Sequence, residues 1–140
     1  MSDDAALLTL ELPGRTAAPA AARQALTALN GSLHLVSEGR LRDVQLIVSE
    51  LVTNAYRHGG GRAAPIHLSV LATDEVLRVE ISDPGSGFDP EVGGARSGSG
   101  ERGWGPMITE RLAHRWGVEQ GEGTTVWFEI DRPADSRSSE

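Results

Sequence analysis

A long amphipathic pattern between Gly39 and His58 constrains the fold of this chain more than any other feature. Its apolar residues recur at spacings of three and four, which places them along one face of an α-helix. They are Leu41, Val44, Ile47, Val48, Leu51, Val52 and Ala55. Three consecutive glycines at 59–61 follow at once, as glycine often does at a helix end. The pattern therefore predicts a single helix with one apolar face to bury.

Shorter alternating patterns before and after this helix predict strands. Leucines alternate with polar residues over 8–12, which is typical of a half-buried strand. Residues 66–82 indicate a hairpin with a turn at 73–75, because apolar and polar residues alternate on both sides of that turn. Residues 116–120 and 124–130 indicate a second pair of antiparallel strands.

Two further helices are predicted. An alanine-rich stretch begins at Pro19 and is expected to stop at Asn30-Gly31. Pro106 suits the first turn of a helix that runs to about His114, because that position has no intrahelical use for an N–H group. The order of elements predicts an α+β fold, a two-layer α/β sandwich with its helices on one face of a mixed or antiparallel sheet.

The length of 140 residues fits one domain, which we assign to residues 1–130. The polar stretch 131–140 is expected to be a tail that does not pack. There is no cysteine, so a disulfide framework and a thiolate metal site are excluded. The formal net charge of -7 without a basic patch argues against direct nucleic-acid binding. An acidic start and no long apolar run predict a cytoplasmic protein without a membrane span.

The segment ELVTNAYRHG carries the first set of candidate functional residues. Glu50 and Asn54 stand four apart and so share one face of the predicted helix. A carboxamide suits a hydrated Mg²⁺ ion, and a carboxylate kept off the metal can accept a proton. Taken alone, such a pair is more often two ordinary polar positions on an exposed helix face.

The segment DPGSGF follows a predicted strand directly. Asp83 at the end of that strand can accept a hydrogen bond from the exocyclic amino group of adenine, which guanine lacks at that position. Gly85 and Gly87 would let the backbone approach a flat base without a Cβ in the way. An Asp-Pro-Gly turn without a ligand is the common alternative.

A glycine-rich segment, GSGERGWG, leads into the helix predicted after Pro106. Free backbone N–H groups around Gly103 and Gly105 can hold phosphates, and Arg102 can add positive charge. A flexible solvated linker has the same composition. Later in the chain, Thr125 opens a strand together with a second threonine, where a hydroxyl can reach a base edge or simply begin the strand.

The order of these segments between about Leu41 and Ile130 resembles the GHKL ATPases, whose Bergerat fold binds ATP. The four boxes of that superfamily correspond to ELVTNAYRHG, DPGSGF, GWGPM and GTTVWF. Within the superfamily the chain is similar to the compact anti-sigma-factor serine/threonine kinases. It starts close to its first predicted strand, so we do not expect the phosphoacceptor helices of a sensor histidine kinase.

The resemblance implies a role for each candidate residue. Glu50 would be the catalytic base, Asn54 the magnesium ligand and Asp83 the adenine-recognising residue. The nucleotide loop would comprise Gly85, Gly87, Gly103 and Gly105, and Thr125 would give a supporting contact. The implied cofactors are ATP and Mg²⁺.

The implied partners are a STAS-type anti-anti-sigma protein and a sigma factor, and related kinases are often homodimers. One departure from the family pattern is Pro106, which stands where relatives usually have leucine and cannot donate an N–H to phosphate. Two readings follow: a kinase that phosphorylates the STAS protein, or a catalytically weak ATP-binding module that regulates its partner by contact.

Overall fold

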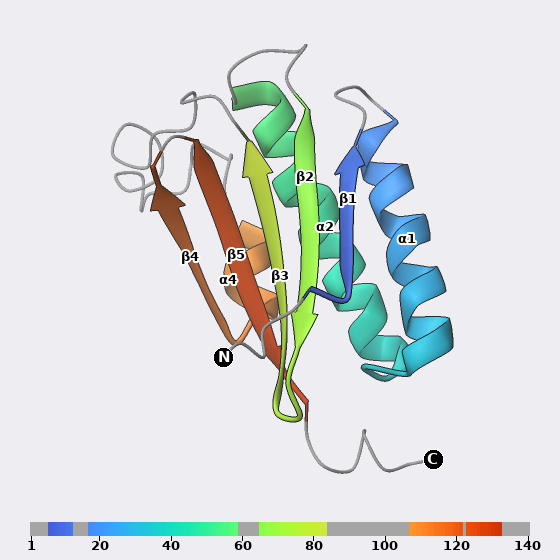
Figure 1. Cartoon of the computed structure of the whole chain (residues 1–140). Coiled ribbons are helices and arrows are strands. Elements are labelled where there is room, and N and C mark those ends of the chain that lie inside the picture. Colours follow the sequence, from blue (N-terminus) through green and yellow to red (C-terminus); the bar gives the residue numbers. More distant parts are fainter. Residues whose placement is uncertain (1–5, 13–16, 59–64, 84–106, 122, 133–140) are drawn as a thin grey trace.

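The computed structural model describes residues 6–12, 17–58, 65–83, 107–121 and 123–132, and these ranges contain five strands and three helices. In chain order the elements are β1 (Leu8–Leu12), α1 (Ala18–Leu33), α2 (Glu38–His58), β2 (Ile66–Ala72), β3 (Val76–Asp83), α4 (Met107–Leu112), β4 (Arg115–Gln120) and β5 (Thr124–Asp131). In Figure 1 the sheet lies in front and the helices lie behind it. The predicted two-layer α+β sandwich is confirmed.

The sheet is antiparallel throughout, with strand order β1-β2-β3-β5-β4. β5 therefore lies between β3 and its own hairpin partner β4. Its pairing with β3 sets Asp83 directly opposite Thr124 and Ser82 opposite Thr125. This register places the end of β3 beside the start of β5, so two segments that are distant in sequence meet at one end of the central strands.

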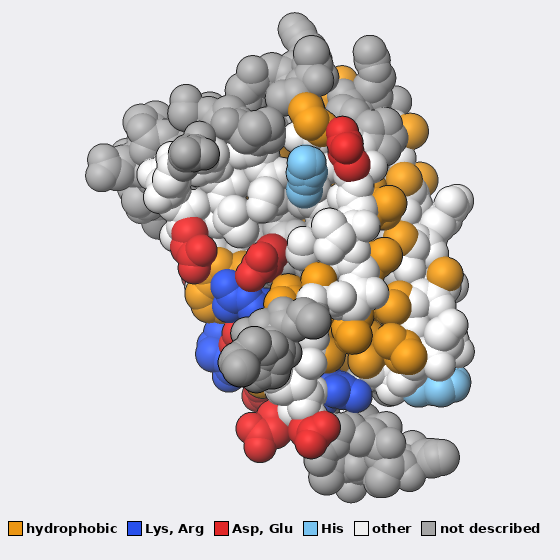
Figure 2. Space-filling view, in the orientation of Figure 1, with side chains coloured by type: hydrophobic (Ala, Val, Ile, Leu, Met, Phe, Trp, Pro, Cys, Tyr) orange, Lys and Arg blue, Asp and Glu red, His pale blue; other side chains and the backbone are white. Residues whose placement is uncertain are grey.

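The core lies between the sheet and the helices. The predicted apolar face of α2 is buried there, with Val44, Ile47 and Val52 fully inaccessible to solvent. Alternate residues of the central strands meet it, including Val79 and Phe128. Since successive residues of a strand point to opposite faces, the intervening residues lie on the outer face. None of the three described helices covers this face, and Figure 2 shows charged side chains on it. No helix in the described ranges has the length and apolar character needed to cross a bilayer.

Helix α1 runs past its predicted stop. Asn30 and Gly31 lie inside the helix, which ends at Leu33 before His34 adopts a left-handed conformation with φ of 51°. The Asn30 side chain accepts a hydrogen bond from the Val36 N–H and donates one to the Val36 carbonyl, both at 3.0 Å. The asparagine therefore anchors the following loop, and the prediction that it stops the helix was wrong.

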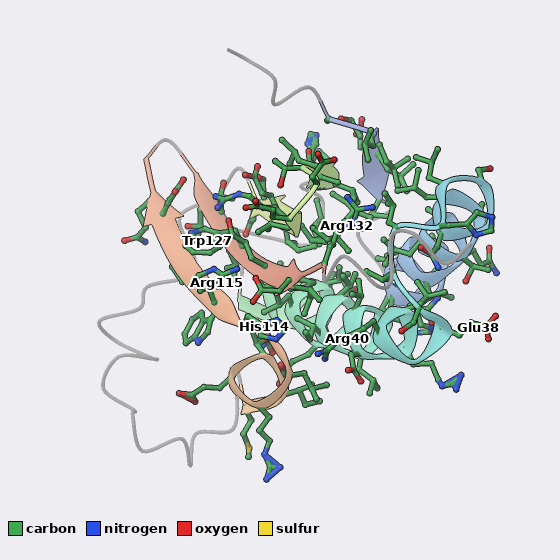
Figure 3. The ribbon with its side chains drawn as sticks, turned by 90° about the horizontal axis from the view of Figure 1, so that it is seen from below. Glu38, Arg40, His114, Arg115, Trp127 and Arg132 are labelled. Atoms are coloured by element: carbon green, nitrogen blue, oxygen red, sulfur yellow. The ribbon has the colours of Figure 1, made fainter. Side chains whose placement is uncertain are left out.

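The fold also continues beyond residue 130, where the domain was predicted to end. β5 includes Asp131, and the Arg132 N–H donates to the Glu75 carbonyl at 2.8 Å. The Arg132 guanidinium also donates to the Leu35 carbonyl at 2.9 Å and to the Thr73 carbonyl. Figure 3 labels Arg132. Arg132 thus ties the end of β5 to two loops because its long side chain reaches both, and residues 133–140 lie outside the described part.

Candidate functional site

The two polar residues predicted on α2 lie in different environments. Asn54 is buried, with 7% of its surface exposed, and Glu50 is only partly exposed. They are one helical turn apart, as their spacing predicts, and the apolar residues of the same helix cover the core. Both therefore stand at the border between the core and the polar side of α2.

The Glu50 carboxylate binds the first turn of α4. Its Oε1 accepts hydrogen bonds from the Thr109 N–H at 3.2 Å and from the Thr109 hydroxyl at 3.1 Å. Its Oε2 accepts one from the Ile108 N–H at 3.4 Å. N–H groups in the first turn of a helix have no intrahelical acceptor, so Glu50 acts as a cap supplied by another helix.

Burial raises the pKa of the Glu50 carboxyl above its ordinary value, and the hydrogen bonds from Ile108 and Thr109 offset part of that rise. A carboxyl with a raised pKa is better suited to accept a proton than an ordinary surface carboxylate. Sequence reasoning missed Thr109, which is fully buried. No spacing rule could have found it, because it lies 59 positions from Glu50 along the chain.

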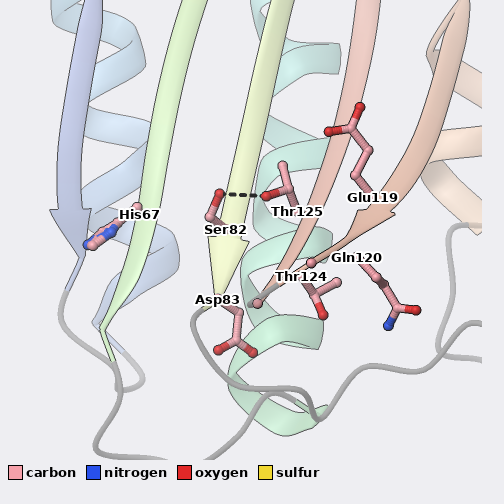
Figure 4. Close-up of a pocket in the computed structure, with 9 residues that line it drawn as sticks. His67, Ser82, Asp83, Glu119, Gln120, Thr124 and Thr125 are labelled. Carbon is pink, nitrogen blue, oxygen red and sulfur yellow. Dashed lines mark hydrogen bonds between the residues drawn. The ribbon is translucent and has the colours of Figure 1, made fainter.

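Asp83 ends β3 on the face of the sheet that the helices cover. It continues the buried series of Leu77, Val79 and Ile81, and 5% of its surface is exposed. Thr124 lies opposite it on β5 and is 3% exposed. The Thr124 hydroxyl is buried and has no hydrogen-bond partner among the described residues. A carboxylate and an available hydroxyl thus meet at this edge (Figure 4).

Thr125, the threonine selected from sequence, lies on the opposite face. Its hydroxyl is 3.0 Å from the Ser82 hydroxyl, and the two residues are cross-strand neighbours. Because side chains alternate along a strand, Thr125 and Asp83 do not share a face, whereas Thr124 and Asp83 do. Thr125 was predicted from the family resemblance to give the supporting contact, whereas the register places its neighbour Thr124 on the face of Asp83.

A hollow of about 620 Å³ lies at this edge of the sheet. Strands β2 to β5 and the turn between β4 and β5 line it with polar groups and glycine backbone (Figure 4). The lining residues are His67, Ser82, Asp83, Glu119, Gln120, Gly121, Gly123, Thr124 and Thr125. His67, Ser82, Glu119 and Thr125 in this lining belong to the outer face of the sheet, whereas Asp83, Gln120 and Thr124 belong to the helix-covered face. The hollow therefore lies around the strand ends and is not confined to the face that Asp83 and Thr124 share.

The remaining predicted site residues, Gly85, Gly87, Arg102, Gly103 and Gly105, lie outside the described residues, as does Pro106. Among the described residues there is no group of three or more acidic or histidine side chains that could hold a metal ion. Mg²⁺ needs few protein ligands when phosphate and water complete its shell, so a single carboxamide is compatible with it.

The donor set fits an adenine nucleotide. The buried Thr124 hydroxyl can donate to a ring nitrogen or hold a water beside the base, and the Asp83 carboxylate can accept from its amino group. On α2, Asn54 would hold the Mg²⁺ ion that accompanies the phosphates, and Glu50 would stay off the metal.

A family model described as "Histidine kinase-like ATPase domain" matches residues 12–130. Among solved structures, 26 chains match. A blue-light activated histidine kinase of Erythrobacter litoralis EL346 is 26% identical with a TM-score of 0.57, over 69% of this chain and 32% of that chain. This chain therefore spans about a third of that kinase. No curated protein matches.

The histidine kinase domain from the same Erythrobacter protein covers 99% of this chain and 67% of its own, with a TM-score of 0.53 and 18% identity. At that identity the likeness concerns the fold alone. The family match, in contrast, includes α2, the β3 end with Asp83 and the start of β5 with Thr124. The chain therefore belongs to the family of histidine kinase-like ATPase domains, within the GHKL superfamily of ATP-binding modules.

Proposed function

We propose that this ATPase domain is an anti-sigma-factor-like serine/threonine kinase. It transfers the γ-phosphoryl group of ATP to a hydroxyl of a STAS-type antagonist and regulates a sigma factor by partner switching. The observation that carries the proposal is the Glu50 carboxylate, which is partly buried, has a raised pKa and stands one turn before Asn54 on α2.

The reaction needs one proton acceptor from the protein. The partner's hydroxyl oxygen forms a bond to the γ-phosphorus, the bond from that phosphorus to the bridging oxygen of ADP breaks, and Glu50 takes the hydroxyl proton. ATP with Mg²⁺ supplies the phosphoryl group and neutralises its charge when bound. Asp83 and Thr124 hold the adenine ring, and this fixes where the phosphates of ATP lie relative to α2.

A second candidate function is the catalytic module of a histidine kinase. The solved structure of highest identity given above, 26%, is a blue-light activated histidine kinase. In that case the acceptor is an imidazole nitrogen, on another chain or on a part of the protein beyond this domain. The two kinase functions differ in the phosphorylated product. Acid treatment tells the products apart, because phosphohistidine is labile in acid and phosphoserine is not.

A third candidate is an ATP-binding regulatory module that acts by contact without transfer. The three hydrogen bonds that occupy Glu50 favour it, because a carboxylate engaged in this way must exchange a partner before it meets a substrate. This module would bind ATP and its partner and leave both unmodified.

The test is phosphate transfer from γ-labelled ATP to candidate STAS proteins and to a histidine-bearing kinase helix pair, with acid treatment of the products. Acid-stable label on the STAS protein supports the proposed kinase, and acid-labile label on the helix pair supports the histidine kinase. ATP and partner binding without label supports the regulatory module. Glu50→Gln should reduce transfer by on the order of 10² to 10⁴ while ATP affinity is kept.

Glu75→Gln is the matched control for that variant. It makes the same change of charge at an exposed position in the β2–β3 turn, at the end of β3 away from Asp83. Its transfer rate should equal that of the wild type. Transfer by Glu50→Gln at the wild-type rate would exclude Glu50 as the base.

A further inference from the structure

The contact between Glu50 and α4 joins two parts of the site that the proposed reaction uses separately. α2 carries the candidate base and magnesium ligand, and α4 follows the segment that contains the second glycine box. Three hydrogen bonds cross between them, and all three end on one carboxylate. The position of the base is therefore fixed by α4 as well as by its own helix.

The two oxygens of that carboxylate are held unequally. Oε1 receives two donors from Thr109 at 3.2 and 3.1 Å, whereas Oε2 receives only the Ile108 N–H at 3.4 Å. Hydrogen bonds of N–H to oxygen are usually close to about 2.9–3.0 Å, so the Oε2 contact is the weaker one. A substrate hydroxyl that binds Oε2 therefore displaces a weaker hydrogen bond than one that binds Oε1.

Thr109 has no exposure to solvent, and its hydroxyl donates to Glu50. Valine has nearly the same shape as threonine and would fill the same space without that donor. The burial of a hydroxyl at this position is therefore explained by its bond to the carboxylate, because a buried hydroxyl without a partner costs stability.

We propose that Thr109 is the positioning residue for the catalytic carboxylate: its N–H and its hydroxyl hold Oε1, which orients Oε2 towards the phosphoryl acceptor. This inference rests on the proposed function, in which Glu50 is the base. It adds a residue from a different helix to the catalytic machinery and makes the base respond to the position of α4.

The charged residues near Glu50 do not position its carboxylate, so the positioning role falls to Thr109. On α4 the charged neighbours Glu110 and Arg111 are both exposed, and on α2 the next polar residue towards the site, Asn54, is uncharged. From the sheet, Asp83 is the titratable residue on the helix-covered face of β3. Among the described residues no charged side chain shifts the pKa of Glu50, so hydrogen bonds from α4 are its main polar influences.

The first part of the test compares Thr109→Val with Thr109→Ser in the complete chain. We expect Thr109→Val to lower kcat for phosphate transfer about 10- to 100-fold with unchanged KM for ATP, because misplacement of a reacting group acts on the chemical step. Thr109→Ser keeps the donor and should restore most of the rate. A folded Thr109→Val protein that transfers at the wild-type rate would overturn the proposal.

The second part needs neither activity nor nucleotide. The amide proton resonances of Ile108 and Thr109 are compared by NMR in the wild type, Glu50→Gln and the control Glu75→Gln. A neutral carboxamide is a weaker acceptor than a carboxylate, so both resonances should move upfield in Glu50→Gln and stay in place in Glu75→Gln. Unchanged Thr109 and Ile108 resonances in Glu50→Gln would overturn the contact itself, even if Thr109→Val failed to fold.

The two parts separate the inference from the proposed function. Wild-type protein that transfers no phosphate, while the amide resonances still respond to Glu50→Gln, contradicts the kinase function and retains the contact between α2 and α4. Normal transfer together with unresponsive amides contradicts the role of Thr109 alone.

Discussion

The two faces of the sheet carry their polar side chains under opposite conditions. On the outer face, Arg78 lies 2.8 Å from Glu80, 3.1 Å from Glu129 and 4.3 Å from the centre of the Trp127 ring. Arg115 likewise bonds Glu129 at 2.8 Å. These groups are partly exposed and are paired with one another, so they are an ordinary solvated surface.

On the helix-covered side, the described polar groups are few: Asp83, Thr109 and Thr124 are buried, and Glu50 is partly exposed. Asp83 ends β3 and Thr124 begins β5 there, and Thr109 and Glu50 meet between the helices. The Thr124 hydroxyl has no hydrogen-bond partner within the described ranges. A buried polar group of this kind lowers stability and persists where a ligand uses it.

In a domain rich in charged residues, exposed charges that pair with one another need no ligand to explain them, whereas buried polar groups without a partner do. The charges gathered around Arg78 and Arg115 lie on the outer face and are explained by their own pairing. The candidate site lies at the strand ends where Asp83 and Thr124 face the helix side, and there the Thr124 hydroxyl has no hydrogen-bond partner among the described residues. Substitutions on the two faces of the sheet should therefore differ in their effects on stability and on ATP binding.

The largest effect is expected from the two neighbouring aromatic residues of β5, which point to opposite faces. Phe128→Ala should lower the free energy of unfolding by about 3–5 kcal/mol, because Phe128 is completely buried in the core. Trp127→Ala should have a clearly smaller effect, since Trp127 is only partly buried. Urea unfolding measures both, and equal losses would contradict the assignment of the faces.

The next effect concerns ATP affinity at the edge of the sheet. Asp83→Asn should weaken ATP binding by about 1.5–3 kcal/mol through loss of a charge-assisted hydrogen bond. Thr124→Val should weaken it by about 1 kcal/mol, and Thr125→Val should leave it unchanged because its hydroxyl faces Ser82 on the other side. Calorimetric titration measures the series. Loss of affinity in Thr125→Val but not in Thr124→Val would reverse the assignment.

A smaller effect is expected from the charge of Glu50. Burial raises the pKa of Glu50 above its ordinary value of 4.5 in the folded protein. At a pH between that ordinary pKa and the raised pKa of the folded state, the folded state therefore binds more protons than the unfolded state. Stability from this group is therefore greatest at low pH and falls as pH rises through that window. Glu50→Gln should gain stability relative to the wild type between about pH 4 and about pH 7.

Urea unfolding of wild type, Glu50→Gln and the exposed control Glu75→Gln at both pH values isolates this contribution. The difference between wild type and Glu50→Gln should change with pH, and the difference between wild type and Glu75→Gln should change less. A constant difference for Glu50→Gln would mean that burial does not perturb this carboxyl.

The smallest effect is expected on the outer face. Arg78→Gln should lower the free energy of unfolding by about 1 kcal/mol or less, because its ion pairs are partly exposed. High salt should reduce the difference further through screening. A loss comparable to that of Phe128→Ala would show that the outer-face cluster is a main source of stability.

Local patterns in the sequence were enough to predict most of the secondary structure. The spacing of apolar residues located α2 and all five strands, because a helix and a strand have different periods and both are encoded by neighbouring residues. Glu50 and Asn54 were identified from their four-residue spacing together with the resemblance of their segment to a GHKL box. Asn30 was misread because its side chain bonds a loop residue, Val36, which a rule for helix ends cannot anticipate.

The tertiary structure decided what depends on contacts between distant segments. The register of β3 against β5 set Thr124, and not Thr125, on the same face as Asp83, since a shift of one residue reverses every side chain of a strand. The packing of α4 on α2 brought Thr109 to Glu50 across 59 positions. Helices, strands and most candidate residues follow from local patterns, whereas the pairs Asp83–Thr124 and Glu50–Thr109 depend on how distant elements pack against one another.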